Sequence, residues 1–268
     1  MAKVLVTGGT GTLGREVVSR LLDKHYSTRI LSHKSKPSVP KGTEVYVGDL
    51  ETGTGLRDAT KDVDAIIHCA SATTGINAYE TDVEGTRKLI ESAKATGSLH
   101  LVYISIVGVD KTQFSYYKAK YDAELLIEKG ELPWTIQRAT QYHNFLLSMI
   151  QSFGGDTLSE IPVPSGMRFQ SIDVGEVADH LVSLVERGPS GRTPYIGGPQ
   201  VLTLEEMTEA YLRIRGKKAT IQPKPIPNDM YDMFRTGIHL CPDRTEGKIT
   251  WEEFVCRLYG EQRLRRAA

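Results

Sequence analysis

Cysteine, net charge and long apolar runs are all scarce in this sequence. Only three cysteines occur in 268 residues, Cys69, Cys241 and Cys256, far apart and without metal-ligand spacing. That pattern predicts reduced thiols in a cytosolic protein, with neither a disulfide framework nor a metal site. No apolar run is long enough to span a bilayer, and no signal-peptide pattern precedes the first apolar run. The sequence therefore predicts no membrane partner.

Charge of either sign is balanced. Lysine and arginine together number 33, as do aspartate and glutamate, so the formal net charge is zero. A neutral chain lacks the field that attracts nucleic acid or an anionic membrane, and we expect neither partner. No internal repeat or low-complexity tract interrupts the chain. What remains is an ordinary globular composition, with 40% hydrophobic and 25% charged residues.

The first 150 residues alternate between strand and helix patterns. Short apolar runs predict buried strands, and apolar positions at helical spacing predict the helices between them. We expect strands at residues 3–7, 28–31, 44–47, 63–69, 100–105 and 134–137, and helices at 13–22, 55–61, 82–95 and 115–129. This succession predicts a doubly wound α/β domain over residues 1–150, with a mostly parallel sheet and right-handed crossovers.

The pattern loosens after residue 150. Pro162, Pro164 and Gly166 indicate an irregular segment. Helices are expected at 174–186, 202–216 and 251–258, with acidic residues or a threonine at their starts. Residues 151–268 are interpreted as a small, mainly helical, partly separate substrate-side lobe of the same structural unit. It is not expected to fold alone, because its helices have no sheet of their own.

The strongest motif lies between the first strand and the first helix, where Val6 to Gly14 is V-T-G-G-T-G-T-L-G. Gly8 is suited to a tight turn, Gly11 to a close phosphate approach, and Gly14 to packing of the helix on the strand. Backbone N–H groups and the helix dipole then favour a pyrophosphate. The motif predicts a Rossmann-type dinucleotide site; the alternative is a tight turn without a ligand. The expected contacts are Gly8, Thr10, Gly11, Thr12, Leu13 and Gly14.

The end of the second strand indicates which dinucleotide binds. An acidic residue there selects NAD(H) by holding the ribose hydroxyls. This chain has Ser32, His33 and Lys34 instead, which suit a 2′-phosphate, so NADP(H) is expected over NAD(H). The alternative is a solvated basic loop. Asp49, after the third strand, either accepts from the adenine amino group or N-caps the next helix.

These motifs occur in the order found in a known family. The glycine turn, Gly48-Asp49-Leu50, His68-Cys69-Ala70-Ser71, residues 82–86 (D-V-E-G-T) and residues 251–254 (W-E-E-F) all match. The chain resembles the atypical short-chain dehydrogenases/reductases of the NmrA-like, NAD(P)H-binding group over nearly its whole length. That resemblance implies further cofactor contacts from Asp49, Leu50, Cys69, Ala70, Ser71, Lys120 and Thr140.

The resemblance also implies a catalytic Tyr-x-x-x-Lys pair, matched by Tyr116 and Lys120. Residues four apart project from one helix face, so the ammonium can lower the tyrosine pKa and hold the nicotinamide ribose. The hydroxyl can then protonate a carbonyl oxygen as hydride arrives. The alternative is a chance spacing, and the adjacent Tyr117 and Lys118 leave the register open.

The family's third catalytic member is a hydroxyl residue at the end of the fifth strand. Members of the family commonly have two adjacent hydroxyl residues at this strand end, and the second is usually the catalytic one. This chain has Ser105 at the first position and Ile106 at the second. Because consecutive strand residues face opposite sides, Ser105 points away from the substrate unless the strand end kinks. Ser105 is nevertheless included as a candidate for orienting the substrate.

The segment after the sixth strand is expected beside the nicotinamide and the substrate, because ligands of such sheets bind at the carboxyl ends of the strands. His143 is either a proton donor or a packed histidine. Apolar walls are expected from Phe169, Met230, Met233 and Phe234, for which core packing is an equal alternative. The expected substrate contacts are Gln141, Tyr142, His143 and Asn144.

Together these features predict an NADP(H)-dependent oxidoreductase that transfers hydride to a small carbonyl or quinone-like compound. The rival is an NmrA-like redox sensor that binds NADP(H) without turnover and regulates a protein partner. The intact Tyr116 and Lys120 favour the enzyme, and Ile106 favours the sensor. A cofactor-assisted isomerase or epimerase is weaker, since fold does not imply function. We expect a cytoplasmic monomer or homodimer.

Overall fold

The computed structural model describes residues 2–72, 78–97 and 99–267. The chain forms two compact units, each of which is described by itself. The first comprises Met1–Arg138 and Val174–Pro194, and the second comprises Ala139–Asp173 and Tyr195–Ala268. The sequence placed a single boundary at residue 150. The structure differs because residues 174–194 return to the first unit, where their helix packs against the first helix of the chain.

The first unit is built on a seven-stranded sheet of order β3-β2-β1-β4-β5-β6-β9. Parallel pairing joins β3 to β2, β2 to β1, β1 to β4, β4 to β5 and β6 to β9. The strand order reverses beside β1, which is where doubly wound sheets bind ligands. The strands are β1 (Lys3–Thr7), β2 (Ser27–Ser32), β3 (Glu44–Val47), β4 (Ala65–His68), β5 (His100–Ile106), β6 (Trp134–Ala139) and β9 (Gly191–Arg192).

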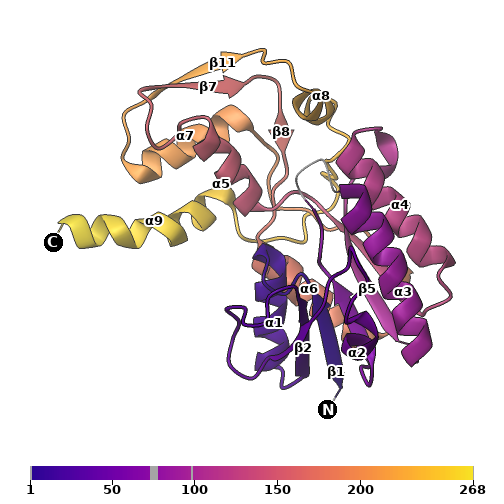
Figure 1. Cartoon of the computed structure of the whole chain (residues 1–268). Helices are drawn as coiled ribbons and strands as arrows, with labels where there is room; N and C mark the ends of the chain where they lie inside the picture. Colours follow the sequence, from indigo (N-terminus) through magenta and orange to yellow (C-terminus); the bar gives the residue numbers. More distant parts are fainter. Residues whose placement is uncertain (1, 73–77, 98, 268) are drawn as a thin grey trace. The chain divides into compact units, whose positions relative to one another are not determined.

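Helices cover both faces of this sheet (Figure 1). On one face α1 packs on α6, and on the other α3 packs between α2 and α4. The helices are α1 (Thr12–Asp23), α2 (Leu56–Thr60), α3 (Gly85–Thr96), α4 (Ser115–Lys129) and α6 (Val174–Arg187), with a π-helix η1 (Tyr79–Glu84) and a 3-10 turn η2 (Val109–Lys111). The doubly wound Rossmann-type architecture predicted from the sequence is confirmed.

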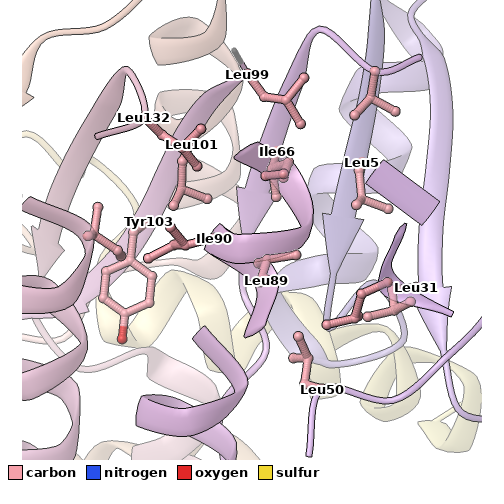
Figure 2. Close-up of a cluster of buried hydrophobic side chains, with 14 of the residues drawn as sticks. Leu5, Leu31, Leu50, Ile66, Leu89, Ile90, Leu99, Leu101, Tyr103 and Leu132 are labelled. Carbon is pink, nitrogen blue, oxygen red and sulfur yellow. The ribbon is translucent and has the colours of Figure 1, made fainter. Parts of the chain in front are cut away.

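Aliphatic side chains fill the layer between the sheet and α2, α3 and α4. Leu5 and Ile66 from the strands meet Leu89 and Ile90 of α3, as Figure 2 shows. Tyr103 of β5 joins this cluster and is fully buried. Because strand side chains alternate between faces, the remaining apolar positions of the same strands face α1 and α6. This core fixes where each strand ends, and therefore where the polar residues after the strands lie.

The first unit follows the predicted periodicity closely. The bounds of β1, β3 and α4 coincide with the expected ones. The helix expected at 82–95 begins earlier, as the π-helix η1, and continues as α3. A π-turn shifts side chains around the helix axis, and such turns are frequent at functional sites. Apolar spacing alone gives no sign of that local widening.

The second unit has small sheets that the sequence did not predict. Strand β7 (Glu160–Pro164) pairs in parallel with β11 (Thr220–Lys224), and β8 (Arg168–Phe169) pairs antiparallel with β10 (Leu202–Thr203). The expectation that its helices lack a sheet was therefore wrong. All four strands are short, and β7 and β11 contain prolines, which hides their periodicity. The helices are α5 (His143–Ser152), α7 (Leu204–Arg215), α8 (Asp229–Arg235) and α9 (Trp251–Ala267).

Two helices of the second unit show how uneven the sequence signals were. Thr203 and Glu206 form a capping box at the start of α7, as its threonine and glutamate predicted. Helix α5 was missed, because His143 begins it without a side-chain cap. Along the described part of the chain, no helix combines the length and apolar character needed to cross a membrane.

Candidate functional site

Two of the three motif glycines are required by backbone packing. Gly8 has φ +67°, and a Cβ there would lie 2.7 Å from the amide nitrogen of Ala70. A Cβ on Gly14 would overlap the carbonyl oxygen of Gly8. The first helix and the end of β4 can therefore approach the turn only while both positions lack side chains. This agrees with the turn and packing roles expected for Gly8 and Gly14.

Gly11 differs, because a Cβ there would meet only the Gly8 oxygen, at 3.2 Å. It is exposed and is the N-cap of α1, and no side chain caps that helix. Uncapped first-turn N–H groups beside open space fit a dinucleotide phosphate. Thr12 is exposed beside them, whereas the Leu13 side chain packs in the core, so only its backbone is available to a ligand.

Arg15 was not identified from the sequence. It lies in the first turn of α1, is exposed, and its Nε donates to the carbonyl of Thr10 over 2.8 Å. A cation at a helix N-terminus opposes the helix dipole, and no acidic residue accompanies it. An anionic ligand would remove that conflict. The basic residue directly after Gly14 was the signal that could have found it.

The loop after β2 combines one buried hydroxyl with exposed basic side chains. Ser32 is buried, and its Oγ accepts from the backbone nitrogen of Lys34 over 3.0 Å. The side chains of His33 and Lys34 are exposed. Ser32 thus stabilises a short turn that presents two basic side chains at the carboxyl end of β2. This geometry is compatible with a 2′-phosphate site and equally with the solvated loop.

Asp49 and Leu50 have local structural roles. The Asp49 carboxylate accepts from the backbone nitrogen of Glu51 over 2.7 Å, while Gly55 is the N-cap of α2. The proposed capping of the next helix by Asp49 was therefore wrong, because its carboxylate closes its own turn instead. The Leu50 side chain is buried in the core against α3. A cofactor can reach Leu50 only through its backbone.

The residues after β4 run along the glycine turn. The Ala70 nitrogen donates to the Thr7 hydroxyl over 3.3 Å and lies against Gly8. Burial raises the pKa of the Cys69 thiol to about 12, partly offset by the nearby Lys120 ammonium, so the thiol stays protonated. Ser71 follows Ala70 in sequence, so it lies directly after the residues that pack on the turn.

Ser71 meets Tyr116 and Asp82. The Ser71 hydroxyl donates to Asp82 Oδ1 over 2.7 Å, and its oxygen lies 3.1 Å from the Tyr116 hydroxyl. Because the one hydroxyl hydrogen of Ser71 goes to the carboxylate, Tyr116 is the donor in the second bond. The backbone nitrogen of Ala72 donates to Asp82 Oδ2 over 3.0 Å. Tyr116 is thus joined to the segment that borders the glycine turn.

Lys120 is buried on the same face of α4. Its Nζ donates to the carbonyl of Ile104 over 2.9 Å, lies 3.6 Å from Asp82 Oδ1, and is 4.2 Å from the ring centre of Tyr103. Burial lowers the pKa of Lys120, and Asp82 offsets part of that shift. Burial and Asp82 raise the pKa of Tyr116 to about 12. The expected lowering of the tyrosine pKa was therefore wrong, since the ammonium is directed to Asp82 and the Ile104 carbonyl.

Ser105 belongs to a different cluster. It is buried near Glu124, and its Oγ has no hydrogen-bond partner among the described residues. Burial would raise the pKa of the Glu124 carboxyl, but Arg138 above all holds it below its usual range. The Arg138 guanidinium bonds both Glu124 oxygens, at 2.8 and 2.7 Å, and Asp110 at 2.7 Å. No bond between Ser105 and Tyr116 is seen. The sequence analysis did not identify Glu124 as the neighbour of Ser105. Glu124 lies two turns along α4 from Tyr116, outside the Tyr-x-x-x-Lys spacing.

A buried histidine connects the turn to Asp82. His68 Nδ1 lies 2.6 Å from the Thr7 hydroxyl, and Nε2 lies 2.9 Å from the Thr86 hydroxyl, which donates to the Asp82 carbonyl over 2.5 Å. Since Thr86 spends its hydrogen on that carbonyl, His68 donates from Nε2 and accepts at Nδ1. Burial lowers the pKa of His68 to about 3, so the ring is neutral.

The candidates after β6 belong to the second unit. The Thr140 hydroxyl accepts from the Gly198 nitrogen over 3.3 Å, and Gln141 is buried. His143 is buried, with Nδ1 2.8 Å from Ser171 Oγ and Nε2 donating to the Ile249 carbonyl over 3.0 Å. With both ring nitrogens engaged, His143 fits the packed histidine, the second of its two alternatives, the first being the proton donor.

Tyr142 and Asn144 are partly buried at the start of α5. Three of the four apolar candidates, Phe169, Met233 and Phe234, are buried, which favours packing, whereas Met230 is partly exposed. Phe169 and Phe234 meet edge to face, with ring centres 4.9 Å apart. These side chains therefore form a core of the second unit.

Comparison with known proteins agrees with the geometry of the turn. A family model for NAD(P)H-binding proteins matches residues 8–186. The chain is 27% identical to a photosystem II assembly factor, Ycf39, of Guillardia theta, over 87% of this chain and 77% of that protein. It is 28% identical to the (4-alkanoyl-5-oxo-2,5-dihydrofuran-3-yl)methyl phosphate reductase of Streptomyces griseus, over 80% of this chain and 74% of that one.

Solved structures show the same fold. An NADPH-dependent quinone oxidoreductase from Escherichia coli, complexed with NADPH, aligns with a TM-score of 0.76 at 18% identity, covering 96% of this chain and 99% of that one. The match from residue 8 to residue 186 includes the whole glycine turn and the Tyr116–Lys120 helix. The chain belongs to the NAD(P)H-binding family, which is consistent with the resemblance to NmrA-like atypical short-chain dehydrogenases/reductases expected from its motifs.

Proposed function

We propose that this protein is an NADP(H)-dependent oxidoreductase that reduces a small carbonyl or quinone-like compound. The observation that carries the proposal is the bond between Tyr116 and Ser71, 3.1 Å long. It joins the Tyr-x-x-x-Lys face of α4 to the segment that packs on Gly8 of the glycine turn. Tyr116 is thus bonded to Ser71, the residue directly after Ala70, which packs on the glycine turn.

The chemistry divides between the cofactor and the chain. When bound, the reduced nicotinamide supplies hydride. Tyr116, with its pKa raised to about 12, keeps its proton at neutral pH and can donate it to the substrate oxygen. The buried Lys120 ammonium supplies positive charge beneath this site, held by Asp82 and the Ile104 carbonyl. A protonated phenol suits reduction better than it suits proton abstraction.

The preference for NADP(H) rests on the loop after β2 and on the turn. His33 and Lys34 are exposed basic side chains at the strand end where an acidic residue would favour NAD(H). Arg15, in the first turn of α1, adds a positive charge near the turn. The E. coli oxidoreductase complexed with NADPH and the Streptomyces reductase support both the cofactor and the reaction class.

The test is oxidation of NADPH by the purified chain with a panel of aldehydes, ketones and quinones. Turnover with at least one class is expected, together with its loss in Tyr116→Phe. NADPH binding by the same variant, measured by calorimetry, separates lost chemistry from lost binding. Tight binding without turnover on the whole panel would contradict the enzyme assignment.

A second candidate is an NADP(H)-binding sensor that regulates a protein partner. The observation that favours it is the end of β5, where Ile106 occupies the family's hydroxyl position and Ser105 is buried against Glu124. The relative from Guillardia theta, whose name is that of an assembly factor, supports this alternative. Under it, NADPH binds and no panel compound is reduced.

A further inference from the structure

Ser71 occupies the position that a catalytic hydroxyl partner needs. A hydroxyl has one hydrogen, and that of Ser71 points to Asp82 Oδ1, 2.7 Å away. Its lone pairs therefore face Tyr116, whose hydroxyl donates to it over 3.1 Å. Tyr116, Ser71 and Asp82 form a directed chain of hydrogen bonds that ends on a carboxylate.

Asp82 is held from several directions, so the direction of this chain is fixed. The Ala72 nitrogen donates to Oδ2 over 3.0 Å, and the Lys120 ammonium lies 3.6 Å from Oδ1. The backbone of Asp82 is held through Thr86 by His68, whose other nitrogen bonds the strand before the glycine turn. Burying a charge such as that of Asp82 costs free energy unless all of its hydrogen-bond and ion-pair partners are in place.

Resting on the oxidoreductase function proposed above, we propose that Ser71, rather than Ser105, is the hydroxyl partner of Tyr116, and that Asp82 orients it. Both are positioning residues that act through Tyr116. As the O–H bond of Tyr116 breaks and a bond forms between its proton and the substrate oxygen, the Ser71 hydrogen turns from Asp82 to the phenolate. Lys120 remains beside Asp82 to balance its charge. The phenolate then takes a proton from solvent, which restores the resting state.

The first experiment compares Ser71→Ala with Ser71→Thr and Ser92→Ala. Ser92→Ala is the control, because it makes the same serine-to-alanine change on α3, away from the site. Ser71→Ala should lower kcat about 10- to 100-fold, the range for losing a hydrogen bond to a developing charge, and this loss should exceed any rise in the Kd for NADPH, to which Ser71 is also an expected contact. Ser71→Thr restores the hydroxyl and should recover most of kcat. Ser92→Ala should match the wild type.

The second experiment reads Tyr116 directly, without turnover. In protein labelled with [13Cζ]tyrosine, the Tyr116 resonance is assigned by its loss in Tyr116→Phe and followed by NMR as pH rises. Asp82→Asn removes the negative charge and should let Tyr116 ionise at lower pH than in the wild type. Asp122→Asn, on α4 and paired with Lys118, removes a surface carboxylate and should leave the titration unchanged. Ser71→Ala should displace the Tyr116 resonance.

Two results would overturn the proposal. One is a Tyr116 resonance that neither Ser71→Ala nor Asp82→Asn alters. The other is full kcat in Ser71→Ala together with a loss in Ser105→Ala, which would return the role to Ser105. If the wild type oxidises no NADPH, the oxidoreductase function fails, and the NMR experiment alone decides whether the hydrogen-bond chain exists. If Asp82→Asn does not fold, the Ser71→Ala spectrum decides.

Discussion

The polar cluster around Tyr116 and the basic loop after β2 are built in opposite ways. In the cluster, Asp82 and Lys120 are buried and bound to neighbours on three elements. In the loop, the side chains of His33 and Lys34 lie in solvent. Both regions are close in sequence to strand ends of the same sheet, so the difference comes from what covers them. The π-helix η1 and α4 cover the cluster.

This difference predicts different kinds of functional effect. Charges buried away from water interact strongly and are already oriented, so they change the activation free energy of the reaction. Exposed charges are screened by water and salt, so they contribute modestly and mainly to affinity. Mutations in the cluster should therefore change turnover by orders of magnitude, and mutations in the loop should change cofactor preference by less.

The largest effect is expected at Tyr116. Tyr116→Phe keeps the ring in place and removes only the hydroxyl that donates to Ser71. Turnover should fall by roughly 10²–10⁴, the usual contribution of a general acid. NADPH affinity, measured by calorimetry, should barely change. A variant that keeps full turnover would mean that the cluster is structural and differs from the loop only in burial.

Lys120→Met is the matched change one turn further along α4. It removes the charge while keeping an unbranched apolar side chain, and it leaves Asp82 buried without its cation. Both turnover and NADPH affinity should fall, because the ammonium supports the site as well as the proton donor. Loss of binding without loss of kcat would limit Lys120 to an anchoring role.

The next effect separates two glycines of one turn. Gly11→Leu places a side chain at the exposed N-cap of α1, where a phosphate is expected, so NADPH affinity should fall by about 100-fold or more while the fold survives. Gly14→Ala instead drives a Cβ into the Gly8 carbonyl and should lower the free energy of unfolding by about 1–3 kcal/mol. Calorimetric titration and urea unfolding measure the two. Unchanged NADPH binding in Gly11→Leu would contradict the phosphate site.

An acid-dependent effect distinguishes His68 from His33. Because burial holds the pKa of His68 near 3, below that of an unfolded histidine, protonation favours the unfolded state. Its contribution is present above about pH 6.5 and is lost as pH falls toward about 3, at up to about 1.4 kcal/mol per pH unit. Unfolding by urea at about pH 7 and pH 5 should therefore show a weaker pH dependence in His68→Gln than in the wild type, by about 2 kcal/mol.

His33→Gln provides the control, because His33 is exposed in the loop. It measures what replacing a histidine outside the buried cluster does to the pH dependence of unfolding. Other buried histidines, including His143 and His239, also have lowered pKa values and contribute to the acid sensitivity of all three proteins. For that reason the comparison uses the difference between each variant and the wild type in how steeply the free energy of unfolding changes with pH. Equal slopes in all three would mean that His68 is not held neutral by burial.

The first unit could be predicted because its signals are local. Apolar runs and helical spacing gave β1 and α4 their bounds, and glycine spacing located the turn. The second unit could not, because β7 and β11 come from distant parts of the chain and contain prolines. Pairing between such segments depends on tertiary packing, which a window of sequence does not contain. The start of α5 at His143 had no capping residue to reveal it.

The candidate site shows the same limit at the level of side chains. The family resemblance identified Tyr116 and Lys120, and it placed Ser71 among the cofactor contacts. Spacing could not show that Ser71 bonds Tyr116 while Ser105 faces Glu124, since that depends on how α4 crosses two strands. Nor could it reveal Asp82 as the carboxylate beside Lys120, because a π-turn sets its direction.

The smallest effect is expected in the basic loop, where it tests whether exposed cations select the cofactor. Two or three charge-assisted bonds to a 2′-phosphate contribute about 1–3 kcal/mol net, so the Kd for NADPH should be roughly 10- to 100-fold lower than that for NADH. Lys34→Ala should reduce that ratio, because Lys34 is exposed at the end of β2. Lys41→Ala, an exposed lysine further along the same connection, is the control. The ratio should also shrink as salt rises, since an exposed phosphate site is screened. Equal Kd values for the two cofactors would mean that the loop is a solvated turn and that recognition resides in the glycine turn alone.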